Sequence, residues 1–303
     1  MPSLQSRFLR FFIRRMNFLN GKDVSIPEMR RRTDSAAGLL RPPGGVSIQS
    51  FSAGTVPAEW LIPQGAPQDR LLLYFHGGGF IFCSLKSHRA LVSRLAIAGG
   101  TRAVSVDYRL APEHPFPAAL DDCLEAYRWT VQSGISPRRI VVAGDSAGGN
   151  LALVLLLALR RAGDPLPAAA VCLSPATDMA WTGDSMRTKA GIDPIFPEGA
   201  SSPLGSSIQS DYIGSEDPRN PLVSPLYGDW RGMPPILLHV GENEILLDDS
   251  VRLGERVREA GGRAEVVIWP GMWHVFQVFA PFLPEANQSI QQIGEFINGM
   301  QRQ

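Results

Sequence analysis

The chain has 303 residues, enough for one large domain or two modest ones. Hydrophobic residues make up 44% and charged residues 19%, and 29 basic residues balance 29 acidic ones. This neutral balance gives no support to a nucleic-acid partner or a strongly charged substrate, so composition leaves a globular enzyme or a binding protein.

The first twenty residues combine apolar side chains, among them Phe8, Phe11 and Phe12, with four arginines. The arginines interrupt the apolar run, which therefore does not match a signal peptide. No other stretch approaches the ~18 uncharged apolar residues of a membrane span. We therefore predict a cytoplasmic protein without a transmembrane segment. The segment is interpreted as an amphipathic helix whose apolar face packs on its own protein; docking on a membrane surface is the alternative.

Strands alternate with helices from residue 46 onward. The predicted strands cover residues 46–52, 56–62, 71–75, 102–106, 140–143, 168–173, 236–240 and 264–268. The predicted helices between and after them cover residues 86–98, 118–132, 147–161, 247–260 and 284–300. This alternation is typical of an α/β fold, here an eight-stranded, mostly parallel sheet with helices on both faces.

A stretch without strands, from about residue 175 to 230, breaks this alternation. It is rich in Pro, Gly, Ser and Asp, and a connection of this length in a compact domain is usually functional. We predict a helical insertion that covers one edge of the sheet and forms a cap together with residues 1–45. Residues 46–303 are then the main α/β domain.

The three cysteines, Cys83, Cys123 and Cys172, are widely spaced and form no C-x-x-C pair. An odd number at these spacings is typical neither of a disulfide framework nor of a zinc site. We expect no bound metal and interpret all three as buried small hydrophobic residues.

A G-x-S-x-G pattern, Gly144-Asp145-Ser146-Ala147-Gly148, lies between an apolar strand and an apolar helix. A strand-to-helix turn this tight strains the serine, and glycines two residues to either side avoid clashes between the backbones. The hydroxyl then stands at a helix N-terminus, where the dipole favours developing negative charge. We predict that Ser146 is a nucleophile; an incidental serine in a glycine-rich turn is the alternative.

A glycine run, His76-Gly77-Gly78-Gly79, follows another apolar strand. Consecutive glycines let backbone N–H groups approach a substrate oxygen without interference from side chains. In acyl transfer such donors bind the oxyanion together with the N–H of the residue after the nucleophile, here Ala147. His76 is expected to order this loop, and a plain glycine turn is the alternative.

A serine nucleophile needs a base. His274 follows the last predicted strand, where the chain order Ser, acid, His places that base. The acid is expected after the preceding strand, where Glu242, Glu244, Asp248 and Asp249 are the candidates. A position just past the strand is better placed than one already in the helix, so Glu244 is favoured, followed by Glu242 and Asp248. The acid would orient His274 and stabilise its imidazolium.

Taken together, three motifs resemble those of the bacterial hormone-sensitive-lipase-like esterases. They are HGGG at 76–79, Asp107-Tyr108-Arg109-Leu110-Ala111-Pro112-Glu113, and GDSAGG at 144–149. The likeness runs from about residue 40 to the end, and it implies a capped α/β-hydrolase fold.

The resemblance also implies roles for single residues. Gly78, Gly79 and Ala147 would supply the oxyanion donors, with a contribution from Gly77, and Asp145 would support the serine motif. The family's acid loop usually reads D-P-L-x-D, whereas this chain has Glu244 at the first position, so Glu stands where Asp is commoner. Four further positions that match the family would support the fold: Asp107, Arg109, Glu113 and Asp121.

These residues predict a carboxylesterase that hydrolyses short- to medium-chain acyl esters through Ser146, His274 and Glu244, without metal or cofactor. The expected length of the acyl chain follows from the resemblance and from a small pocket shaped by the cap and Phe80. A lactone hydrolase and an aryl-amide deacetylase or amidase are alternatives, because the same three residues serve both reactions. A non-catalytic receptor is disfavoured, because such receptors lack a working base. The partner is a small-molecule ester, and the resemblance allows for a homodimer.

Overall fold

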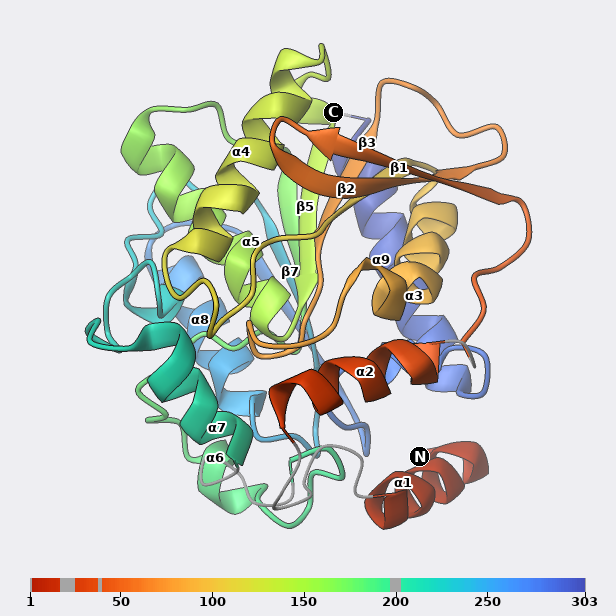
Figure 1. Ribbon diagram of the computed structural model, residues 1–303, viewed down its shortest axis with the longest axis vertical. Coiled ribbons are helices and arrows are strands. Elements are labelled where there is room, and N and C mark those ends of the chain that lie inside the picture. The colour runs from red at the N-terminus through yellow and green to blue at the C-terminus, as the bar shows by residue number, and fades with distance from the viewer. Residues whose placement is uncertain (1, 17–24, 38–39, 197–202, 303) are drawn as a thin grey trace.

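The computed structural model describes residues 2–16, 25–37, 40–196 and 203–302, and a single eight-stranded sheet runs through its centre (Figure 1). The strand order is β1-β2-β4-β3-β5-β6-β7-β8. β2 pairs antiparallel with β1 and β4, and the other pairs are parallel. The strands are Val46–Ala53 (β1), Val56–Pro63 (β2), Leu71–Phe75 (β3), Arg102–Val106 (β4), Ile140–Asp145 (β5), Ala169–Leu173 (β6), Ile236–Gly241 (β7) and Ala264–Trp269 (β8).

Five long helices cover the two faces of this sheet. α3 and α9 pack on one face, and α4, α5 and α8 pack on the other. They are Leu85–Gly99 (α3), Ala118–Gln132 (α4), Ala147–Ala162 (α5), Leu247–Glu259 (α8) and Pro284–Met300 (α9). The predicted α/β-hydrolase fold is confirmed, with each strand bound within two residues and each of these helix bounds within one.

The central strands are buried on both sides, which explains why they are continuous apolar runs rather than alternating ones. Within β3, Leu72 and Tyr74 join the core beneath α3 and α9, whereas Leu71, Leu73 and Phe75 join the core beneath α5. Successive side chains of a strand point to opposite faces, so both layers need apolar residues. The two cores together fix the carboxyl edge of the parallel strands.

The connection between β6 and β7 is less helical than predicted. Its described part contains only short helical turns, and loops occupy the rest. The turns are Ser185–Thr188 (α6), Pro203–Ser207 (α7), the π-helix Ile208–Ile213 (η3) and the 3₁₀ turn Pro225–Tyr227 (η4). Prolines lack the N–H that a continuing helix needs, which accounts for the short lengths. The division of the chain into a cap and a main domain stays a prediction.

Two helices precede the sheet, Leu4–Met16 (α1) and Ile26–Ala37 (α2). α2 is tied to the body through Arg30, which donates to the carbonyls of Ile81 and Ala111 and pairs with Glu113 at 2.7 Å. α1 lies at the outer side of the molecule (Figure 1). The prediction that its apolar face packs on the protein holds for Leu9 and Ile13, which contact the core. It is wrong for the rest of that face, because Leu4, Phe8, Phe11 and Phe12 are exposed.

No helix in the described ranges is long and apolar enough to cross a membrane. Cys123 and Cys172 are buried as predicted, whereas Cys83 is only half-buried, beside the pocket described below.

Candidate active site

Ser146 occupies a strained turn between β5 and α5. Its backbone has φ 52° and ψ −117°, a conformation that side-chain-bearing residues rarely adopt. A Cβ on Gly144 would lie 2.2 Å from the Gly148 carbonyl oxygen, and one on Gly148 would lie 2.0 Å from that of Phe75. Both glycines are therefore required by close backbone contact, as the sequence pattern predicted.

The Asp145 carboxylate holds the start of the glycine run. Its Oδ1 accepts hydrogen bonds from the Gly77 N–H at 3.0 Å and from the Tyr74 hydroxyl at 2.6 Å. Burial raises the pKa of Asp145, but the nearby His88 ring and the Tyr74 hydrogen bond outweigh burial and leave the pKa below its usual value. Asp145 is therefore an anion beneath the loop.

This bond corrects one prediction. Because the Gly77 N–H already donates to Asp145, Gly77 has no donor left for a substrate oxygen. A Cβ at this position would lie 2.2 Å from Asp145 Oδ2, so Gly77 is a glycine because the carboxylate approaches its backbone closely. The interpretation of Gly77 as an oxyanion donor is wrong; its N–H anchors the loop.

Gly78 and Gly79 lie on the wall of the pocket together with Ala147, the first residue of α5. Both glycines have positive φ, 106° and 60°, and a Cβ on Gly78 would lie 2.1 Å from the carbonyl oxygen of Phe82. The structure thus brings together the backbone of three of the four predicted oxyanion donors.

His76 is buried behind this loop. Its Nδ1 lies 2.8 Å from the Gly77 carbonyl oxygen, and its ring stacks on Tyr108 at 4.4 Å. Burial, with the neighbouring His88, lowers the pKa of His76 to about 4. A neutral, enclosed imidazole is suited to ordering the loop.

His274 and Glu244 meet behind the pocket. His274 Nδ1 lies 3.4 Å from Oε1 of Glu244, whose side chain is fully buried. The second oxygen of Glu244 accepts from the Gly241 N–H and from the Ser174 hydroxyl, both at 2.8 Å. Burial lowers the pKa of His274, but the hydrogen bond and the charge of Glu244 outweigh it, so the pKa lies above its ordinary value.

The competing carboxylates lie elsewhere. Glu242 is exposed and accepts from the Gly271 N–H at 2.7 Å. Asp248 accepts from the Ser185 N–H at 2.8 Å, at the base of α6. Asp249 is buried, not simply a carboxylate at a helix start, and accepts from the N–H groups of Thr177 and Asp178 at 2.5 and 2.9 Å. Glu244 is the one candidate that contacts His274.

Ser174 is a site residue that the sequence analysis missed. It follows β6 and has φ 48°. Its hydroxyl donates to Glu244 and accepts from the Val275 N–H at 3.1 Å, so it links the acid to the backbone next to His274. One signal could have indicated it. Ser174 is a polar residue at the carboxyl end of β6, and β6 lies between β5, which leads to Ser146, and β7, which leads to Glu244.

Asp193, in the β6–β7 connection, was also missed. It is buried, and it accepts from the N–H of Ile195 at 2.9 Å and from that of Ile245, the residue after Glu244, at 3.2 Å. Burial raises the pKa of Asp193 to about 6, against the opposing effect of His274. This carboxyl fastens the insertion to the acid loop, and the Phe196 ring then lies edge-on to the His274 ring at 4.9 Å.

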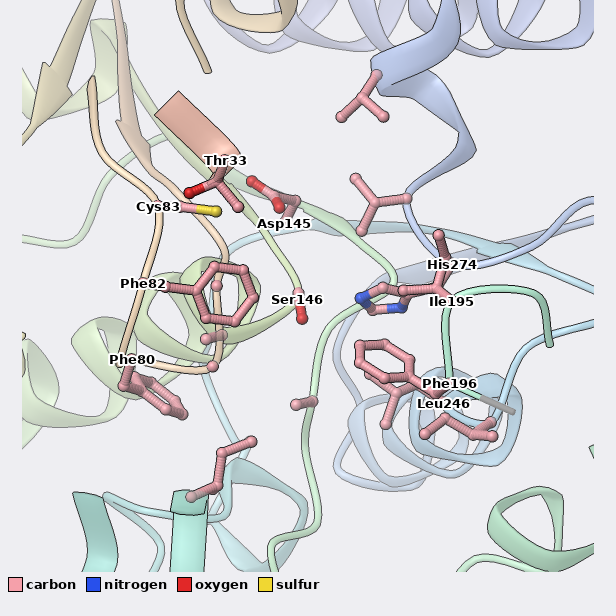
Figure 2. Close-up of a pocket in the computed structure, with 18 of the residues that line it drawn as sticks. Thr33, Phe80, Phe82, Cys83, Asp145, Ser146, Ile195, Phe196, Leu246 and His274 are labelled. Carbon is pink, nitrogen blue, oxygen red and sulfur yellow. The ribbon is translucent and has the colours of Figure 1, made fainter. Parts of the chain in front are cut away.

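These residues surround a cavity of about 250 Å³. Figure 2 shows the Ser146 hydroxyl and the His274 ring facing each other across it, with Phe80 and Phe82 on one side and Phe196 by the ring. Phe80, predicted to shape the pocket, lines it and stacks on Tyr212 of η3 at 3.7 Å. The α2 region and the insertion supply further wall residues: Thr33, Ala36, Leu40, Met179, Trp181, Met186, Ile195 and Ile208.

Comparison with known proteins supports the same class. Residues 72–278 match the alpha/beta hydrolase fold family. The chain is 41% identical to an acetyl-hydrolase from Streptomyces hygroscopicus over 88% of its own length and 86% of the relative's. It is 38% identical to an esterase from Acinetobacter venetianus, covering 84% of this chain and 83% of that one. A crystal structure of an esterase from the bacterial hormone-sensitive lipase family superposes with a TM-score of 0.93 at 41% identity, over 99% of both chains.

A pocket at the carboxyl edge of this sheet that is lined by Ser146 and His274, together with relatives of this kind, defines a serine ester hydrolase. The chain belongs to the α/β-hydrolase family, in its bacterial hormone-sensitive-lipase-like branch.

Proposed function

We propose that the chain is a carboxylesterase that hydrolyses short- to medium-chain acyl esters through Ser146, His274 and Glu244. One observation carries this proposal. Ser146 and His274 line the same apolar pocket beneath the glycine loop, and Glu244 contacts the far nitrogen of His274. The acetyl-hydrolase and esterase names of the relatives support the same reaction.

The first half of the reaction forms an acyl-enzyme. Because His274 Nδ1 faces Glu244, its Nε2 is the nitrogen left for the Ser146 proton. As that proton moves to Nε2, the Ser146 oxygen bonds to the ester carbonyl carbon and the carbonyl electrons move onto oxygen. When the carbonyl reforms, the bond to the alcohol oxygen breaks, and the alcohol leaves with the proton from His274.

The second half repeats these steps with water. Water bonds to the acyl carbon as His274 takes its proton, and Ser146 leaves with that proton, releasing the carboxylic acid. Neither half requires a metal or cofactor. In both, the N–H groups of Gly78, Gly79 and Ala147 would bind the oxyanion, and the α5 dipole adds to them.

The size and lining of the pocket support short to medium acyl chains. Its volume of about 250 Å³ lies below the roughly 300–1,000 Å³ of pockets that enclose drug-sized ligands. Its walls are mostly apolar, so they favour an acyl chain over a charged group.

Replacing the nucleophile tests the reaction. Ser146→Ala is expected to lower kcat on p-nitrophenyl butyrate by about 10⁶-fold, while circular dichroism stays that of the wild type. A sulfonyl fluoride should label the wild-type chain once, on the Ser146 peptide, and leave Ser146→Ala unlabelled. Substantial remaining turnover in the variant, or labelling elsewhere, contradicts the proposal.

The substrate is tested with matched leaving groups. A p-nitrophenyl series from acetate to palmitate is expected to peak at short to medium chains. A p-nitroanilide with the best acyl group, and a lactone of similar size, should react more slowly than the ester. A faster anilide or lactone would favour the amidase or the lactone hydrolase instead.

Three further expectations from the sequence stay predictions: a cap made of residues 1–45 and the insertion, a cytoplasmic location, and a homodimer. β8 could support self-association, since among the described strands it pairs only with β7, and its Ile268 is 45% exposed. Light scattering after size exclusion would test the homodimer.

A further inference from the structure

The first helix carries an unusual exposed surface, which we call the α1 apolar face: Leu4, Phe8, Phe11 and Phe12. These side chains are 77%, 72%, 59% and 50% exposed. Their spacing places them on one side of a helix. Elsewhere in the described chain no helix carries more than one exposed large apolar residue. A contiguous patch of this kind marks an interaction surface.

The opposite side of α1 is fastened to the protein. Ser6 is buried, and Leu9 and Ile13 pack against the core. The Ser3 N–H and hydroxyl donate to Glu285 at 2.6 and 3.0 Å. Arg10 donates to the Ile192 carbonyl at 2.9 Å, and Arg14 donates to that of Gly191. Because these bonds fix the rotation of the helix, the α1 apolar face points outward.

The charge of α1 selects its partner. The helix contains Arg7, Arg10, Arg14 and Arg15 and no acidic residue, in a chain whose net charge is zero. Within the described ranges none of these arginines forms an ion pair with a carboxylate, and the Arg15 guanidinium lies over the Phe11 ring at 5.1 Å. A second copy docked on this face through a two-fold axis would bring arginines against arginines, which is unfavourable.

Helices with phenylalanine and leucine on one face and arginines beside them bind in the plane of lipid bilayers, attracted by anionic headgroups. We propose that α1 docks the protein on an anionic lipid surface. Leu4, Phe8, Phe11 and Phe12 would enter the boundary between headgroups and acyl chains, while Arg7 and Arg15 contact lipid phosphates. This binding goes beyond ester hydrolysis and does not depend on it.

The anchors of α1 connect this surface to the pocket. Arg10 and Arg14 hold residues 191–192, a few residues before Ile195 of the pocket wall. On the other side, a Cβ on Gly271 would lie 2.3 Å from Pro2, so Pro2 lies against the loop that leads to His274. A protein docked through α1 would therefore hold its pocket close to the lipid surface.

Vesicle sedimentation with the full chain tests the proposal. The probes are vesicles of phosphatidylcholine alone and of phosphatidylcholine mixed with phosphatidylglycerol. Binding is expected to be about tenfold stronger to the mixed vesicles at low salt, because each arginine near an anionic surface adds attraction, and to weaken at high salt. Equal binding to both vesicles, or binding to neither, overturns the proposal.

Two variants locate the surface, with one control. Phe8→Ser combined with Phe12→Ser should abolish sedimentation, and Arg7→Gln combined with Arg15→Gln should remove the preference for phosphatidylglycerol. Ile97→Ser, which changes an exposed residue of α3, should bind like the wild type. Loss of binding in the control, or none in the phenylalanine variant, contradicts the assignment.

A soluble ester separates this proposal from the proposed function. All of these variants should hydrolyse p-nitrophenyl butyrate at the wild-type rate, since none of the changed residues lines the pocket. If the wild type is a dimer and Phe8→Ser dissociates it into monomers, a second copy covers the α1 apolar face. That result would overturn the lipid proposal and leave the esterase proposal intact.

Discussion

The carboxyl edge of the sheet and the segments that cover it are held in different ways. At the edge, close contacts and hydrogen bonds fix the reactive residues. Glycines without room for a Cβ flank Ser146, and Glu244 is held by the Gly241 N–H and the Ser174 hydroxyl. The cover consists of α2 and the β6–β7 connection, which has only short helical turns in its described part. It meets the pocket mostly through apolar side chains.

This difference follows from what each region has to do. Acyl transfer requires donors and a base placed to within fractions of an ångström, which rigid backbone and supporting hydrogen bonds provide. Enclosing an acyl chain requires apolar surface, which many arrangements supply. Two buried carboxyl groups join the regions: Asp193 links the cover to the acid loop, and Asp249 links α8 to residues 177–178.

Among the residues that support Ser146, the acid at the edge should have the largest effect on activity. Glu244→Gln keeps the shape but removes the charge that orients His274 and stabilises its imidazolium, so kcat on p-nitrophenyl butyrate should fall by about 10⁴-fold. Glu242→Gln is the matched control and should be close to the wild type, because Glu242 is exposed and bonds only to Gly271 in the described chain. A larger loss in the control would mean that the acid has been misassigned.

A smaller loss is expected from the oxyanion loop. In Gly78→Ala the new Cβ meets the Phe82 carbonyl oxygen at 2.1 Å, so the loop must move and its N–H groups shift from the oxyanion. Losing one such donor lowers kcat by about 10²–10³-fold with little change in KM. Gly45 also has a positive φ, 80°, but a Cβ there would have no atom within 4 Å. Gly45→Ala therefore controls for backbone strain. Equal losses in both variants would refute the contact argument.

The edge was also the part that the sequence predicted. Ser146, His274 and Gly148 belong to patterns whose spacing reflects backbone geometry, and the structure places them as those patterns require. Gly77 was misinterpreted because a glycine run does not reveal which N–H meets the Asp145 carboxylate.

The cover was harder to predict. Asp193 follows no pattern, because its partner on the acid loop, Ile245, lies 52 residues further along the chain. Contacts between distant irregular segments leave no periodic signal. The exposure of α1 was missed for a related reason. An amphipathic sequence predicts an apolar face without indicating whether protein covers it.

Removing the charge of Asp193, which joins the two regions, should have a moderate effect on activity. Asp193→Asn places an amide group in the site of a carboxylate that accepts three backbone N–H groups, those of Ile195, Phe196 and Ile245. This change should lower kcat/KM by about tenfold. Because the charge of Asp193 helps to raise the pKa of His274, the acid limb of the pH–rate profile should move to lower pH. Asp184→Asn, on an exposed residue of the same connection, should leave the profile unchanged. An unmoved acid limb in Asp193→Asn would show that this carboxyl acts only on structure.

The smallest effect on activity, but a clear effect on stability, is expected at Asp249. Burial raises its pKa from 3.8 to about 7, so the folded state binds the proton more tightly than the unfolded state does. The stability that this group contributes is therefore complete below about pH 4 and is lost as the pH rises toward 7. Since a tenfold change in proton affinity corresponds to about 1.4 kcal/mol, the loss amounts to at most about 4 kcal/mol.

Asp249→Asn tests this link between α8 and the insertion. The amide oxygen can still accept from the Thr177 and Asp178 N–H groups, and the amide nitrogen replaces Oδ1, which has no partner among the described residues. The variant should match the wild type in thermal unfolding near pH 4 and be more stable at pH 8, with ester hydrolysis unchanged. A variant that is less stable at pH 8 would mean that the charged carboxylate is the form the fold requires, and that the two regions are joined by an ionic contact.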